Sequence, residues 1–107
     1  MVATIASQTT VPQAGIVSVV TSGSTAVTAV SGFVNGGYIY NPVTATDQAI
    51  AVPESLYVDP VGVPTLVGHG TTTALMPGQK YDIPPGANTT IKVNAATNGH
   101  AFNVVVW

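Results

Sequence analysis

The chain has 107 residues and a formal net charge of -2, and charged residues make up 6% of it, against roughly 25% in ordinary soluble domains. Because its bases are limited to Lys80 and Lys92, no basic patch can form, which argues against binding to nucleic-acid phosphates. No apolar run approaches the roughly 20 residues of a membrane-spanning helix, so we expect no membrane partner either.

The distribution of Gly and Pro indicates the fold class. Eleven Gly and eight Pro cut the chain into pieces too short for ordinary helices, and Val and Thr, which favour strands, recur throughout. The sequence therefore predicts an all-β protein, a small antiparallel β-sandwich or barrel, with a jelly-roll-like arrangement among the options. We expect a single β domain over residues 13–107, preceded by an extended, uncharged N-terminal arm over residues 1–12. Residues 1–7 lack the basic residue and long apolar block of a usual signal peptide.

The first elements after the arm are two short apolar strands. Residues 15–21 and 25–30 flank Ser22-Gly23-Ser24, a turn sequence, so we expect them to pair as a hairpin. Asn35-Gly36-Gly37 predicts a second turn, because these residues accept positive φ. Residues 43–48 are expected to form a loop or at most one helical turn. Further strands are expected at 38–40 and 71–76, and two apolar segments, 49–52 and 56–58, flank Pro53 and Glu54.

The last third has the clearest alternation. Tyr81 and Ile83 share one face of a predicted strand, with both neighbouring charges on the other. Asn98-Gly99 is a favoured two-residue turn, so residues 89–107 are predicted to form a hairpin. The residues expected to face inward are Ile91, Val93, Phe102, Val104 and Val106, and those expected on the opposite faces are Lys92, Asn94, Asn103, Val105 and Trp107.

A search for reactive groups finds no catalytic signature. The chain has no Cys, and His69 and His100 lack metal-ligand spacing, so each is interpreted as a polar loop or turn residue. The four acids are scattered; whether distant acids converge stays open at this point. We therefore predict a non-enzymatic protein with no catalytic residue, no metal site and no cofactor.

The low charge favours a protein that works by assembly. A free monomer normally carries more surface charge for solubility, so coverage by partners is one explanation; adequate wetting by Thr, Ser, Asn and Gln is the other. Aromatic residues and the uncharged chain ends are the natural contact candidates, with simple packing inside the monomer as the alternative. The interface candidates are Val2, Ile5, Tyr38, Tyr40, Tyr57, Val105 and Trp107.

Several short motifs resemble small proteins encoded among the virion genes of tailed bacteriophages. The resemblance extends over roughly residues 36–107, and its motifs are at 37–42, 47–52, 56–62, 75–79 and 93–102. It implies a structural virion protein, and within that class a capsid decoration (cement) protein fits best. Such proteins are β-rich and often trimeric, and they strengthen the outside of the shell.

The resemblance implies a location and partners. We expect the chain to be made in the host cytoplasm, to form a homo-oligomer, with a trimer favoured, and to bind the major capsid protein on the virion surface. Another virion part, such as a head fibre or tail component, is an alternative that shares every sequence feature. A carbohydrate-binding β-sandwich is the alternative from another class; its stacking faces would be Tyr38, Tyr40, Tyr57 and Trp107.

Overall fold

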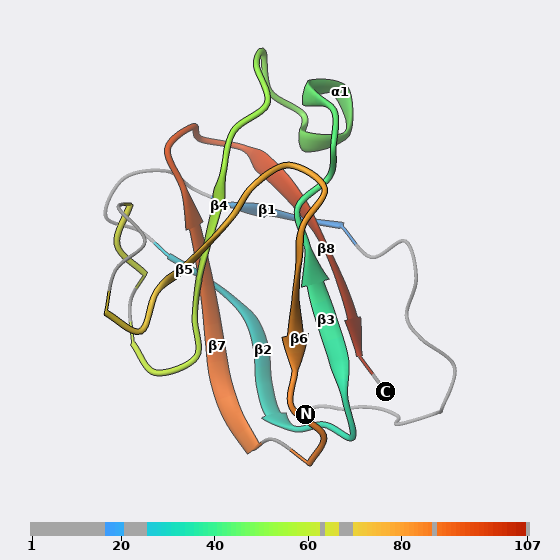
Figure 1. Ribbon diagram of the computed structural model, residues 1–107, viewed down its shortest axis with the longest axis vertical. Coiled ribbons are helices and arrows are strands. Elements are labelled where there is room, and N and C mark those ends of the chain that lie inside the picture. The colour runs from blue at the N-terminus through green and yellow to red at the C-terminus, as the bar shows by residue number, and fades with distance from the viewer. Residues whose placement is uncertain (1–16, 21–25, 63, 67–69, 87, 107) are drawn as a thin grey trace.

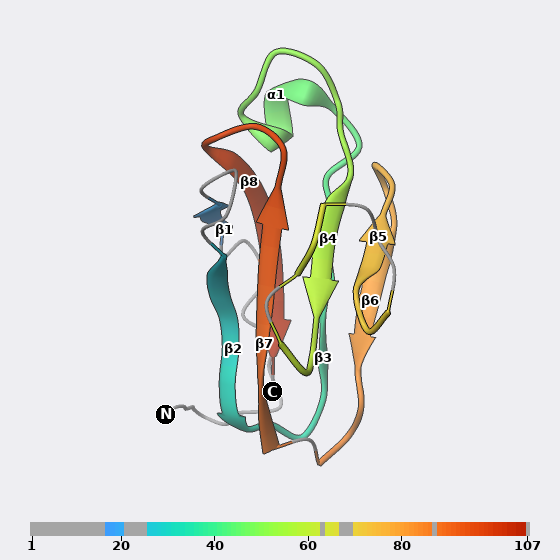
Figure 2. The same ribbon diagram turned by 90° about the vertical axis from the view of Figure 1, so that its left-hand side faces the viewer.

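The described chain is a sandwich of two antiparallel sheets (Figures 1 and 2). The computed structural model describes residues 17–20, 26–62, 64–66, 70–86 and 88–106. Its strands are β1 (Val17–Val20), β2 (Val27–Phe33), β3 (Gly37–Tyr40), β4 (Leu56–Asp59), β5 (Thr73–Leu75), β6 (Lys80–Ile83), β7 (Asn88–Ala95) and β8 (His100–Val106). A single turn of helix, α1 (Ala45–Gln48), lies between β3 and β4, and no helix of the described part could cross a bilayer. The predicted arm, residues 1–12, lies outside the described residues.

The strand order is that of a jelly roll. One sheet has the order β1-β8-β3-β6 and the other β2-β7-β4-β5, so most consecutive strands lie in opposite sheets. Figure 2 shows the β2-β7-β4-β5 sheet in front of the other one. The predicted antiparallel sandwich is confirmed, and it is an open sandwich rather than a closed barrel.

Both predicted hairpins are wrong. β1 pairs with β8 and β2 pairs with β7, so β1 and β2 do not form a hairpin. The second predicted hairpin, made of β7 and β8, is also absent from the described residues. β7 pairs with β2 and β4, whereas β8 pairs with β1 and β3. Gly99 does adopt a positive φ of 86°, as its turn requires, but the turn carries the chain across the sandwich to the other sheet. A local turn signal shows where a strand ends and says nothing of which strand pairs with the next one.

The core lies between the sheets and follows the predicted alternation. Its largest fully buried members come from both sheets: Ile39, Leu56, Val58, Ile91, Val93 and Phe102. Burying a side chain of this size contributes about 1.5–3 kcal/mol, so these six residues provide much of the stability. The single helical turn, the turn before β3 and the separation of Tyr81 and Ile83 from their charged neighbours are also as predicted.

Two residues expected outside the core are buried. Asn94 is 1% exposed and Val105 is 2% exposed, although each lies on the outer face of its sheet. Asn94 shares its face with Asp59, which is 3% exposed. The segment after β4 lies over part of this face (Figure 2), so the region of Asp59 and Asn94 is covered by the chain itself. Alternation distinguishes the two faces of a strand, but it does not show what a long loop covers.

Candidate functional site

The structure separates the predicted interface residues. Tyr38 and Tyr40 flank the buried Ile39 and therefore lie on the outer face of the β1-β8-β3-β6 sheet, whereas Tyr57 lies on the outer face of the opposite sheet. All three side chains are half-buried. Val105 is too deeply buried in this conformation to offer a contact surface. The other candidates, Val2, Ile5 and Trp107, lie outside the described residues.

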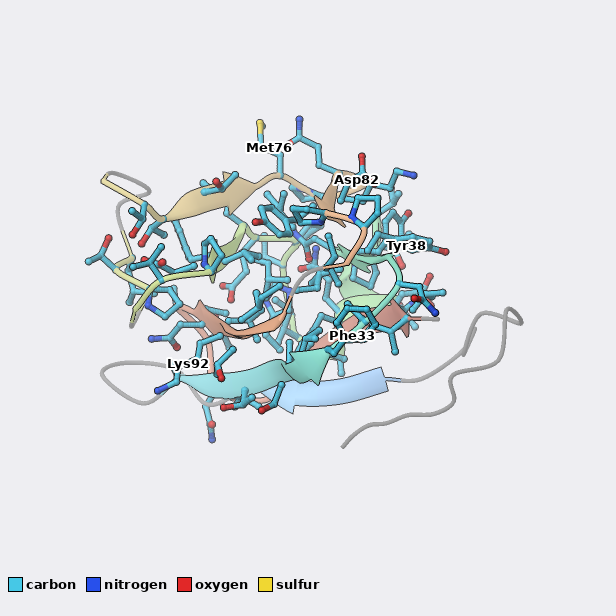
Figure 3. The ribbon with its side chains drawn as sticks, turned by 90° about the horizontal axis from the view of Figure 1, so that it is seen from below. Phe33, Tyr38, Met76, Asp82 and Lys92 are labelled. Atoms are coloured by element: carbon cyan, nitrogen blue, oxygen red, sulfur yellow. The ribbon has the colours of Figure 1, made fainter. Side chains whose placement is uncertain are left out.

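The outer face beside β3 carries a compact charged pair. The Nζ of Lys80 lies 3.5 Å from Asp82 Oδ1 and 4.9 Å from the centroid of the Tyr38 ring. Figure 3 shows Tyr38 and Asp82 on one side of the molecule and Lys92 on the other. Because the pair is well exposed, it contributes little to stability, but it leaves this face close to neutral.

A surface hollow lies between this face and α1. It measures about 320 Å³ and is lined by Tyr40, Pro42, Val43, Asp47 and Asn103. Tyr40 and Asn103 are brought together because they are register partners on β3 and β8. Asp47 is placed by α1, where its backbone N–H donates to the Oγ1 of the cap residue Thr44 at 3.1 Å.

Exposed apolar side chains lie at the same end of the sandwich. Val43 is 57% exposed and Met76 is 61% exposed. The turn between β5 and β6 lies near α1 in Figure 1, and Gly78 of that turn packs against Val43. We call Tyr40, Val43, Asp47, Met76 and Asn103 together the α1-end surface. Sequence reasoning missed Val43 and Met76 because both sit beside a proline in a turn, where alternation assigns no face.

A buried polar network lies directly beneath α1. His100 is fully buried; its Nδ1 is 3.0 Å from Glu54 Oε2 and its Nε2 is 2.8 Å from Asn41 Oδ1. The Nδ2 of Asn41 donates to the carbonyls of Glu54 and Leu75, both at 2.9 Å. Its Oδ1 also accepts from the Nε2 of Gln48 at 3.1 Å. Asn41 therefore uses its full hydrogen-bonding capacity.

Both ring nitrogens of His100 face oxygen atoms, the Oε2 of Glu54 and the Oδ1 of Asn41. Burial alone would raise the pKa of Glu54. Hydrogen bonds from His100 and Thr97 outweigh that effect and hold its pKa below the ordinary value.

A second buried carboxylate holds the segment between β4 and β5. Asp59 accepts the backbone N–H groups of Val61 at 2.8 Å and Gly62 at 3.0 Å, together with the hydroxyls of Thr71 and Thr72 at 2.9 Å. Burial would raise the pKa of Asp59, but these four donors outweigh it and lower the pKa. Both carboxylates thus hold loop residues in place through hydrogen bonds: Asp59 those between β4 and β5, and Glu54 Thr97 before β8.

Glu54, Asp59 and His100 all have partners inside the fold. His100 has no solvent exposure and both of its nitrogens are bound, so it has no free position for a substrate proton. Glu54 and Asp59 serve separate clusters, and no group of three metal-ligating side chains gathers in the described part of the chain. His69 lies outside the described residues. The interpretation of His100 as a turn residue missed its two long-range partners, Glu54 and Asn41, since nothing local to it signals them.

Comparisons with protein-family models, curated proteins and solved structures found no match for the chain. A jelly roll by itself supports many unrelated functions, among them capsid and lectin roles. The function must therefore be argued from the surfaces described above and from the sequence.

Proposed function

We propose that this protein is a structural virion component, a capsid decoration protein that binds the outer surface of a phage head and bridges neighbouring capsid subunits. The proposal begins from the sequence resemblance and its low charge. The observation that carries it further is the chemistry of the surface. The buried carboxylates are hydrogen-bonded inside the fold, while the apolar side chains of Val43 and Met76 stay exposed on the α1-end surface.

The separation of the contact candidates fits a bridging role. Tyr40 and the α1-end surface lie on one side of the sandwich, and Tyr57 lies on the outer face of the other sheet. A protein that joins two subunits needs two separate contact areas, and several such contacts from one homotrimer would add avidity. We assign the major capsid protein to one area and a second copy of this chain to the other.

The proposal is tested with purified protein and emptied heads of the phage that carries the gene. We expect a trimer by light scattering and co-sedimentation with heads but not with free capsid subunits. Val43→Glu places a charge on the α1-end surface and should weaken binding by at least about tenfold, the cost of an unpaired charge in an interface. Val61→Glu is the matched control, because Val61 is 76% exposed on the segment after β4, away from α1. A monomer that does not sediment with heads would overturn the proposal.

The two alternative functions, another virion component and a carbohydrate-binding module, need different surfaces. A head fibre or tail component would use the same surfaces, and imaging of whole particles separates it from a decoration protein. A carbohydrate-binding module would need an aromatic platform. Tyr38 and Tyr40 lie opposite Tyr57, so these three residues do not form one continuous platform within a single copy.

A further inference from the structure

The hollow beside α1 gathers one aromatic residue and unused polar groups. Within the described part of the chain, the side chains of Tyr40, Asp47 and Asn103 make no hydrogen bond or ion pair, although all three line the same hollow. This contrasts with the neighbouring network, where every polar atom has a partner. Unused donors and acceptors beside an aromatic wall are what a small polar ligand requires.

The lining selects the class of ligand. Asp47 disfavours an anion, and the nearest cation along the sheet, Lys80, is held by Asp82 and the Tyr38 ring. A cation would use the carboxylate of Asp47 but would leave the donor half of the Asn103 amide without a role. A neutral molecule with several hydroxyl groups and an apolar face uses all three side chains.

We propose that this hollow binds one neutral sugar residue of a glycan. Tyr40 supplies the aromatic wall for the apolar C–H face of the sugar, Asp47 accepts from its hydroxyls, and Asn103 both donates and accepts. A volume of about 320 Å³ is at the lower end of the range of small-molecule pockets, which suits a single ring rather than a chain of sugars. The inference does not rest on the proposed role in the virion, although the hollow belongs to the α1-end surface and a head subunit bound there would compete with the sugar.

The buried network prepares the hollow for binding. Asn41 and Gln48, which bracket the segment that contributes Pro42, Val43 and Asp47, are joined by a 3.1 Å hydrogen bond, and Gln48 Nε2 also donates to the Pro42 carbonyl at 2.7 Å. Three of the five lining residues are thus held in place before a ligand arrives. A site formed in advance loses less entropy on binding, so a shallow hollow can still bind in the millimolar range.

The test is an amide chemical-shift titration of the whole, isotopically labelled chain. The probes are glucose, galactose, mannose and N-acetylglucosamine, with tetramethylammonium as the cation probe and inorganic phosphate as the anion probe. We expect at least one sugar to shift amides of residues 40–48 and 103 with millimolar affinity, and neither ion to do so. Failure of every sugar, or the same shifts with either ion, would overturn the proposal; head binding is a separate measurement and would be unaffected.

Paired variants locate the site. Tyr40→Ala should weaken sugar binding at least about fivefold and Asp47→Ala at least about tenfold, through loss of stacking and of a charged hydrogen-bond acceptor. Tyr57→Ala and Asp82→Ala are the matched controls and should stay within about twofold of the original affinity. Asp47→Ala leaves the α1 cap intact, because Thr44 bonds the backbone of residue 47, so this variant decides the matter even if Tyr40→Ala does not fold. Equal losses in Asp47→Ala and Asp82→Ala would contradict the assignment.

Discussion

Asn41→Ala is the most direct test of the buried network. The substitution removes four hydrogen bonds with lengths between 2.8 and 3.1 Å. The Nδ2 of Asn41 donates two of them, to the carbonyls of Glu54 and Leu75, and its Oδ1 takes part in the other two, with Gln48 and His100. At about 0.5–1.5 kcal/mol each, their loss should lower the free energy of unfolding by about 2–6 kcal/mol. Domains of this size unfold with about 5–15 kcal/mol, so the variant should be close to unfolding.

The assay is urea denaturation followed by far-ultraviolet circular dichroism, with the midpoint and slope fitted separately. Asn98→Ala is the matched control, because Asn98 is exposed in the turn before β8 and its loss should change stability by less than about 0.5 kcal/mol. A loss below about 1 kcal/mol in Asn41→Ala would refute the reasoning. It would mean that water replaces the amide without cost and that the network does not hold the fold.

Two further predictions concern acid and close packing. The pKa values of Glu54 and Asp59 are lowered in the folded protein, so the ionised carboxylates stabilise the fold. This contribution is fully present above the ordinary pKa values of 4.5 and 3.8, and it is lost as the pH falls below those values. The melting temperature should therefore fall steeply below about pH 4.5, and less steeply in Asp59→Asn, which has one fewer group to protonate. Gly37→Ala should cost about 3 kcal/mol or more, because a Cβ there would overlap the Val105 carbonyl oxygen. Gly62→Ala, where a Cβ meets nothing within 4 Å, should be nearly neutral in the same thermal unfolding assay.

The strands themselves were readable from the sequence, but their partners were not. Alternation placed Ile91, Val93 and Phe102 in the core, because the period of two is a property of each strand alone. Pairing depends on which apolar faces meet, and the jelly roll places β7 and β8 in opposite sheets despite the short turn between them. A Gly turn is compatible with a hairpin and with a crossing between sheets. A prediction made from the turn alone chooses the hairpin, because that is the more local pairing, and here it was wrong.

The candidate site was predicted only in part, for a related reason. Tyr40 was recognised as a contact residue, yet Asn103 joins it through strand pairing and Asp47 through the single turn of α1. His100 lies 46 residues from Glu54 and 59 from Asn41, and only the fold brings the three together. Polar residues spread over such separations carry no local pattern that distinguishes a buried network from solvated loops.

The network also explains how so short a helix persists. A single turn fixes several backbone dihedrals for very few hydrogen bonds and is unstable alone. Here it ends at Ala49 in the left-handed region, with φ of 61°, a conformation that costs a non-glycine residue about 1–2 kcal/mol. The preceding residue, Gln48, is fully buried and bonded to Asn41 and Glu54, which offsets that cost. The walls of the hollow therefore depend on a network that no ligand would touch.

The distribution of charge ties these features to the kind of partner the protein can bind. Glu54 and Asp59 are used inside the fold, and Lys80 and Asp82 neutralise each other. The other two formal charges, Asp47 and Lys92, make no ion pair in the described part of the chain. Long-range electrostatic attraction is therefore weak, and recognition must rely on shape, apolar contact and neutral hydrogen bonds. The two proposed partners, a capsid surface and a neutral glycan, can both be bound on those terms.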